Sequence, residues 1–242
     1  YGYGSGASIK GDQNTGIGDG ATQVVTGAGN LGLGSFAARF VSGNYNSASG
    51  VFAGNSVTGN SNIASGFSAG VNVVGDQNVG IGYFDGLSVS GSSNTAVGDS
   101  AGQSVTGSNN SAFGAYAGRS VSGDYNLGTG RGAGTIVVGT ANVASGWRAG
   151  QTVTGNNNIA TGTSAGVNVI GNNTLAIGTS TGQNVTGDDN TATGYLTGQN
   201  VTGNGNIAYG RSVGVSVTGD YNTAYGYGSG ASIKGDQNTG IG

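Results

Sequence analysis

The sequence predicts an all-β fold: a parallel β-solenoid of about fifteen 16-residue coils, with two short strands in each coil. Three observations predict it. The chain repeats every 16 residues over its full length, without an insertion. Glycine recurs at fixed places in every repeat, which disfavours helices. Leu, Ile, Val and Phe together make up only 47 of 242 residues, too few to fill a conventional globular core.

The 16 positions of the repeat differ in how much variation they accept. With Thr15, Leu31 and Ser47 at position 1, the pattern is x-A-x-G-x-x-A-G-x-x-V-T-G-x-x-N. Position 11 is always Val or Ile, position 2 is Ala or Gly, and positions 4 and 13 are always Gly. Position 16 is Asn in every copy except one, where Thr174 replaces it. A position fixed in all copies is predicted to lie inside the coil or at an obligatory turn.

We place one strand at positions 1–3 and the other at positions 10–12. Alternate side chains of a strand point to opposite faces, so the residue at position 11 points inward and its neighbours point outward. Ala or Gly at position 2 faces it across a thin core. The predicted core ladder consists of Val25, Val41, Val57, Val73, Val89, Val105, Val121, Val137, Val153, Val169, Val185, Val201 and Val217.

The corners between the strands are predicted from Gly and Asn. Glycines at positions 4 and 13, and usually at position 8, permit backbone angles that other residues resist. Asn at position 16 is predicted to stack into an amide ladder that satisfies backbone groups of the turn. Because no insertion or linker interrupts the repeat, residues 1–242 are predicted to form a single continuous solenoid domain.

The outward face of the first strand is more apolar than a solvent-facing strand should be. Large apolar residues recur at positions 1 and 3, and such a stripe marks an interface. Parallel association of identical rods would cover it, whereas the alternative is a monomeric solenoid with an apolar flank. The predicted oligomer interface comprises Leu31, Leu33, Ile63, Val79, Ile81, Val97, Phe113, Leu127, Val143, Ile159, Leu175, Ile177, Ile207 and Tyr209.

The run N-x-A-x-G-x-x-A, as in Asn94 to Ala101 (NTAVGDSA), resembles the head repeat of trimeric autotransporter adhesins of the YadA type. The resemblance covers the whole chain and implies a left-handed parallel β-roll that packs as a parallel homotrimer on a bacterial cell surface. This chain departs from the family's 14-residue motif by two extra residues per coil and by Val at position 11. It also shows no neck, coiled-coil stalk or membrane anchor.

The composition argues against several other functions. His, Cys and Glu are absent, so an enzyme, a cofactor site and a metal site are not predicted. Asp188 and Asp189 form the only acidic pair, and neighbouring residues in a turn point apart. Some corners carry Gly-Asp-x-Asn, a pattern found in calcium-binding solenoids, but the equivalent corner in many other coils has no acidic residue to bind calcium. A net charge of −3 with seven cations argues against nucleic acid, and no apolar run reaches the length of a membrane span.

One alternative function comes from the outward residues of the second strand. Ser56/Thr58, Ser104/Thr106, Thr152/Thr154, Asn184/Thr186, Asn200/Thr202 and Ser216/Thr218 would form polar ladders like those of ice-binding solenoids. Phe40, Val74, Ile136, Val138 and Ile170, together with two lysines, interrupt these ladders. A solvated polar strand is the simpler interpretation.

A second, longer repeat is present. Residues 1–18 recur unchanged as residues 225–242, at an offset of fourteen coils. We therefore expect the chain to be one part of a longer tandem array. The function predicted from the sequence is that of a non-enzymatic, extracellular adhesive or structural fibre segment, whose repeated weak contacts act together by avidity.

Overall fold

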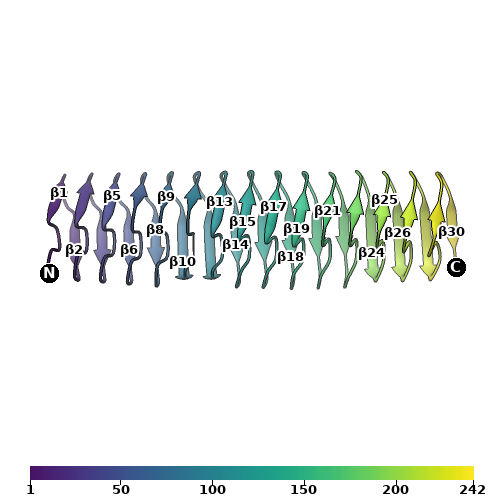
Figure 1. The fold of residues 1–242 in the computed structure, drawn as a ribbon, viewed down its shortest axis with the longest axis horizontal. Coiled ribbons are helices and arrows are strands. Elements are labelled where there is room, and N and C mark those ends of the chain that lie inside the picture. The colour runs from purple at the N-terminus through teal and green to yellow at the C-terminus, as the bar shows by residue number, and fades with distance from the viewer. The chain divides into compact units, whose positions relative to one another are not determined.

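The computed structural model describes residues 1–242 and contains thirty β-strands and no helix. Two parallel sheets form a β-solenoid of about fifteen turns of about 16 residues, as the sequence predicts. The chain divides into two compact units, Tyr1–Ser122 and Gly123–Gly242. In each unit, successive strands alternate between an odd-numbered and an even-numbered sheet (Figure 1). The structure therefore contains no helix that could span a lipid bilayer.

In the first unit, the odd-numbered sheet contains β1 (Ser8–Lys10), β3 (Val24–Thr26), β5 (Phe40–Ser42), β7 (Val57–Thr58), β9 (Val73–Val74), β11 (Val89–Ser90), β13 (Ser104–Thr106) and β15 (Ser120–Ser122). The even-numbered sheet contains β2 (Thr15–Ile17), β4 (Leu31–Leu33), β6 (Ser47–Ser49), β8 (Ile63–Ser65), β10 (Val79–Tyr83), β12 (Thr95–Asp99) and β14 (Ser111–Phe113).

In the second unit, the odd-numbered sheet contains β17 (Ile136–Val138), β19 (Thr152–Thr154), β21 (Val169–Ile170), β23 (Val185–Thr186), β25 (Val201–Thr202), β27 (Val217–Thr218) and β29 (Ile233–Lys234). The even-numbered sheet contains β16 (Leu127–Thr129), β18 (Val143–Ser145), β20 (Ile159–Thr161), β22 (Leu175–Ile177), β24 (Thr191–Tyr195), β26 (Ile207–Arg211), β28 (Thr223–Tyr227) and β30 (Thr239–Ile241).

Within each unit, every strand pairs in parallel with the strand one coil further along the chain. Ile9 pairs with Val25 in the odd-numbered sheet, and Thr15 pairs with Leu31 in the even-numbered sheet. Each residue therefore stacks on the residue at the same position of the next coil. This constant register explains why positions in contact with the next coil accept so little variation.

The strand limits differ from the predicted ones in two ways. In seven coils the residue at position 10 has a φ between 53° and 70°, so the second strand begins only at position 11; these residues are Ser56, Asn72, Ser88, Asn168, Asn184, Asn200 and Ser216. In five coils the first strand continues to position 5, namely in β10, β12, β24, β26 and β28.

The core has three walls of small side chains. The predicted valines at position 11 form the first wall and are at most 5% exposed. Alanine or glycine at position 2 forms the second, with Ala48 and Ala160 as buried examples. The third wall is alanine at position 7, such as Ala53 and Ala69, which are fully buried. The predicted core contains only positions 2 and 11, although position 7 is mostly Ala in the sequence.

The asparagines at position 16 form the predicted amide ladder along one corner. The backbone N–H of Asn30 donates to Asn14 Oδ1 at 2.9 Å, and its Nδ2 donates to the same oxygen at 3.0 Å. Nδ2 of Asn30 also donates to the carbonyl of Gly43, in the next coil, at 2.8 Å. The same bonds recur from Asn46 to Asn30. Each buried amide thus joins three successive coils, which offsets the cost of removing it from water.

The fixed glycine at position 4 is required by both conformation and space. Gly162 has a φ of +125°, which residues with a Cβ rarely adopt. A Cβ built on it would collide with the carbonyl oxygen of Gly178, the equivalent residue of the next coil. The tight stacking of successive corners therefore excludes every other residue type at this position.

Candidate functional site

The outer face of the even-numbered sheet is the main candidate for a functional surface. Its strands alternate in burial, with position 2 buried and positions 1 and 3 at the surface, as in β4, β14 and β22. All fourteen side chains of the predicted interface lie on this outer face, and none of them is buried. Ile63, Ile159 and Tyr209, for example, are 45%, 42% and 42% exposed.

The apolar side chains of this face stack in register within each unit. In the second unit, Val143 pairs with Ile159, and Ile159 pairs with Leu175. Further along, the rings of Tyr209 and Tyr225 stack with their centroids 5.3 Å apart. The stripe is broken where Ser47 and Ser49, or Thr191 and Thr193, occupy both outward positions; β6 and β24 carry these pairs.

An aromatic cluster widens the face in the first unit. Tyr83 is the last residue of β10, so its side chain follows those of Val79 and Ile81 on the outer face. Its ring stacks on Phe67 at 5.4 Å and meets Phe84 edge-on at 4.4 Å. Phe52 contacts Phe67 at 6.4 Å and stacks on Phe36 at 5.2 Å.

This cluster is not apparent from the repeat pattern, because its members occupy the variable positions 5 and 6 of four different coils. No single coil shows the pattern. Only the 16-residue register places Phe36, Phe52, Phe67, Tyr83 and Phe84 side by side. Counting aromatic residues at positions 5 and 6 of consecutive coils would have found it.

The outer face of the odd-numbered sheet is less regular than the ice-binding alternative requires. Ser56, Asn184, Asn200 and Ser216, four of the six predicted position-10 ladder residues, have left-handed φ angles and stand outside the strands. Large apolar residues also interrupt the face: Val74 is 56% exposed and Ile170 is 58% exposed. Asn168, Asn184 and Asn200 do form a short amide ladder, with Nδ2 to Oδ1 distances of 3.0 and 2.9 Å.

The acidic corner residues serve the turns. Asp188 Oδ1 accepts the backbone N–H of Asn172 at 2.7 Å, whereas Asp189 Oδ1 accepts Nδ2 of Asn173 at 2.9 Å. Asp76 Oδ1 accepts the backbone N–H of Asn60 in the same way at 2.7 Å. These carboxylates are thus occupied in joining one coil to the preceding one. No group of three or more Asp, Glu, His or Cys side chains gathers where it could hold a metal ion.

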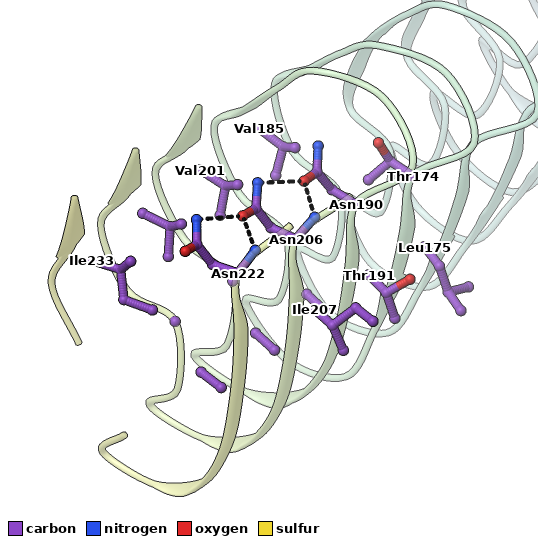
Figure 2. A pocket seen from close by; sticks show the side chains of 17 residues that line it. Thr174, Leu175, Val185, Asn190, Thr191, Val201, Asn206, Ile207, Asn222 and Ile233 are labelled. Carbon is purple, nitrogen blue, oxygen red and sulfur yellow. Dashed lines mark hydrogen bonds between the residues drawn. The ribbon is translucent and has the colours of Figure 1, made fainter. Parts of the chain in front are cut away.

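A narrow apolar cavity lies inside the coils of the second unit. Val185 and Val201 line one side, and the Asn190–Asn206–Asn222 ladder lines another (Figure 2). Val217 also lines the cavity. The cavity exists because valine and alanine together do not fill the coil completely. Thr174 stands at its end, where its buried Oγ1 has no hydrogen-bond partner. The cavity is part of the core and carries no group suited to catalysis.

The geometry therefore offers one extended surface, the apolar face of the even-numbered sheet. Comparison of the chain with family models, with curated proteins and with solved structures finds no match.

Proposed function

We propose that the chain is a segment of an extracellular adhesive or structural fibre that associates with identical chains through the outer face of the even-numbered sheet. The parallel homotrimer implied by the resemblance to YadA-type heads is the assembly we propose. In this proposal the protein has no enzymatic activity, and it acts at a bacterial cell surface through repeated weak contacts along a stiff solenoid.

The observation that carries the proposal is the uncovered apolar stripe. A row of isoleucine, leucine, valine and tyrosine side chains recurs along both units, although the core holds only small residues. Soluble monomers rarely expose contiguous apolar patches of this kind. In parallel association, each coil would meet an equivalent coil, so a 16-residue repeat supplies the same contact many times.

The ice-binding alternative receives less support. A flat lattice of hydroxyls needs two continuous rows, and left-handed residues at position 10 interrupt one of them. Thermal hysteresis of the purified protein would discriminate between the two functions, because a fibre segment should show none.

The mass in solution tests the proposal. A trimer should have about three times the 23.2 kDa of one chain, whereas a monomer at micromolar concentration would contradict the proposed assembly. Light scattering after size-exclusion chromatography gives this mass directly.

A matched pair of variants tests which face is used. Ile159 and Ile170 belong to the same coil but lie on the even- and odd-numbered sheets, and they are 42% and 58% exposed. Ile159→Lys should dissociate the assembly, because it places a charge within the apolar stripe. Ile170→Lys should leave the mass of the assembly unchanged, because Ile170 lies on the other sheet. Equal effects of the two variants would show that the even-numbered face is not the interface.

A further inference from the structure

Asp85 occupies a core position that carries no charge in any other coil. It lies at position 7, where the preceding and following coils carry Ala69 and Ala101. All three residues are fully buried. A carboxyl group enclosed between alanines is costly in its charged form, because the apolar interior solvates it poorly.

The two oxygens of Asp85 have different surroundings. Oδ1 accepts the backbone N–H of Ala101 at 2.7 Å. Oδ2 is buried and has no hydrogen-bond partner. Since buried polar atoms nearly always have a partner, the unpaired Oδ2 needs an explanation.

Two other coils show what position 7 offers to a polar side chain. Thr181 Oγ1 donates to the carbonyl of Gly194 at 2.6 Å, and Thr197 Oγ1 donates to the carbonyl of Gly210 at 2.7 Å. In both cases the acceptor lies 13 residues further along, in the next coil. The corresponding residue for Asp85 is Gly98.

Asp85 Oδ2 lies where the threonine hydroxyls lie. A Cβ built on Gly82 would meet both the carbonyl oxygen of Gly98 and Asp85 Oδ2, the latter at 2.7 Å. A Cβ built on Gly178 would likewise meet the carbonyl oxygen of Gly194 and Thr181 Oγ1, the latter at 2.9 Å. A carbonyl oxygen only accepts hydrogen bonds, so Oδ2 can bond to the Gly98 carbonyl only when it is protonated.

The surroundings of Asp85 oppose its ionisation. Burial raises its pKa from 3.8 to about 6; the N–H groups of Ala101 and Gly98 act in the opposite direction, and the nearby Asp99 carboxylate raises the pKa further. The facing strands β9, β11 and β13 carry no titratable side chain, nor does the preceding corner at residues 67–70. On its own coil the nearest titratable group is Tyr83, whose ring packs in the surface aromatic cluster.

We propose that Asp85 is a proton-operated latch between its own coil and the following one. When the carboxyl is protonated, Oδ2–H donates to the Gly98 carbonyl while Oδ1 accepts the Ala101 N–H, so two hydrogen bonds join the coils. When the proton is released to water, the first bond is lost and a carboxylate faces a carbonyl oxygen in the core. The junction between the two coils then loosens.

The sign of the pH effect follows from the two pKa values of the group. The folded chain binds the proton more tightly than the unfolded chain. The contribution of the latch to stability is therefore complete below about pH 4, and it is lost as the pH rises through about 6. Between pH 5 and pH 7.5 the unfolding equilibrium constant should increase about tenfold through this group alone.

The direct test is a pH titration of the Asp85 ¹³Cγ resonance in the full chain, together with urea unfolding at pH 5 and pH 7.5. We expect a titration midpoint near 6; a midpoint near 4 would overturn the proposal. Asp85→Asn keeps an acceptor for the Ala101 N–H and supplies a permanent donor for the Gly98 carbonyl. It should therefore remove the part of the change in the unfolding equilibrium constant between pH 5 and pH 7.5 that is due to Asp85. Asp19→Asn, which removes an exposed carboxylate, is the control: its unfolding equilibrium constant should change between the two pH values as much as that of the wild type.

A second variant covers the case in which the amide does not fit the site. Asp85→Thr reproduces the residue that Thr181 and Thr197 place at the same position. It should also lack the wild-type change between the two pH values. If the wild type and a folded Asp85 variant lose stability equally over this range, the latch does not exist.

Discussion

The Cβ of Ala48 lies 2.8 Å from the point that a Cβ on Gly54 would occupy. These residues hold positions 2 and 8 of one coil, and only one of them has room for a methyl group. In the preceding coil the arrangement is reversed, with Gly32 at position 2 and Ala38 at position 8. The core thus accepts one methyl group per coil at this contact, on either side.

Gly54→Ala should therefore destabilise the protein by about 1–3 kcal/mol, because the added methyl group overpacks the contact with Ala48. The double variant Ala48→Gly/Gly54→Ala reproduces the natural arrangement of Gly32 and Ala38. It should recover most of the loss, apart from the cost of Ala at a φ of +58°. Urea unfolding of the wild type, both single variants and the double variant measures the coupling. Strictly additive effects would contradict the proposed contact.

Thr174→Asn should stabilise the protein. Thr174 is 2% exposed, and its Oγ1 has no partner, whereas the other members of the ladder each bridge neighbouring coils. Asparagine would restore the amide interactions between Asn158 and Asn190. The expected gain is about 1–3 kcal/mol, the cost of leaving a buried polar group unsatisfied.

The midpoint of thermal unfolding checks this gain. The reverse change, Asn206→Thr, introduces the same defect elsewhere in the ladder and should lower the midpoint. A neutral Thr174→Asn would mean that the threonine hydroxyl is satisfied by other means.

Gly162→Ala should prevent stable folding of its region, since its Cβ would collide with the backbone of the next coil at a φ of +125°. Gly132 provides the matched control. It also has a positive φ, of 67°, but the nearest atom to a Cβ there is 3.7 Å away. Gly132→Ala should cost only about 1 kcal/mol, the price of a left-handed conformation.

Circular dichroism and urea unfolding of these two variants separate collision from conformational preference. Similar losses of stability in the two variants would show that the stacked carbonyl of Gly178 is not the reason why position 4 is always glycine.

Asp85→Ala should change stability in a pH-dependent way. At pH 7.5 the variant removes a carboxylate from an apolar site, so the free energy of unfolding should rise by about 2–3 kcal/mol, the equivalent of the shift from 3.8 to about 6. At pH 4 the wild-type group is neutral, and this gain should disappear. Urea unfolding at both pH values makes the comparison. A gain of equal size at pH 4 would assign the effect to packing instead of charge.

Much of the fold could be predicted from the sequence because every coil repeats the same constraint. Val153, Ala160 and Asn158 each stand at positions that vary little in fifteen copies, and their burial follows from that restriction. The apolar stripe was visible for the same reason: Ile159 and Leu175 recur where a strand should face water.

The missed features depend on neighbours in adjacent coils. Tyr45 and Gln13 adopt φ angles of 58° and 60° at position 15, although their intrinsic preferences oppose this. Hydrogen bonds from the stacked coils fix the backbone there, so local propensity does not decide the conformation. The burial of Asp85 could not be predicted in this way, because no other coil carries an acidic residue at position 7.

The amide ladder has a consequence for how such a chain can change its length. Its hydrogen bonds connect residues 13 or 16 apart, so loss or gain of one whole repeat restores every partner with an equivalent one. Deleting a single residue would instead misalign all subsequent pairs. The number of coils can therefore change during evolution in steps of one whole repeat, with little effect on the chemistry of the surface.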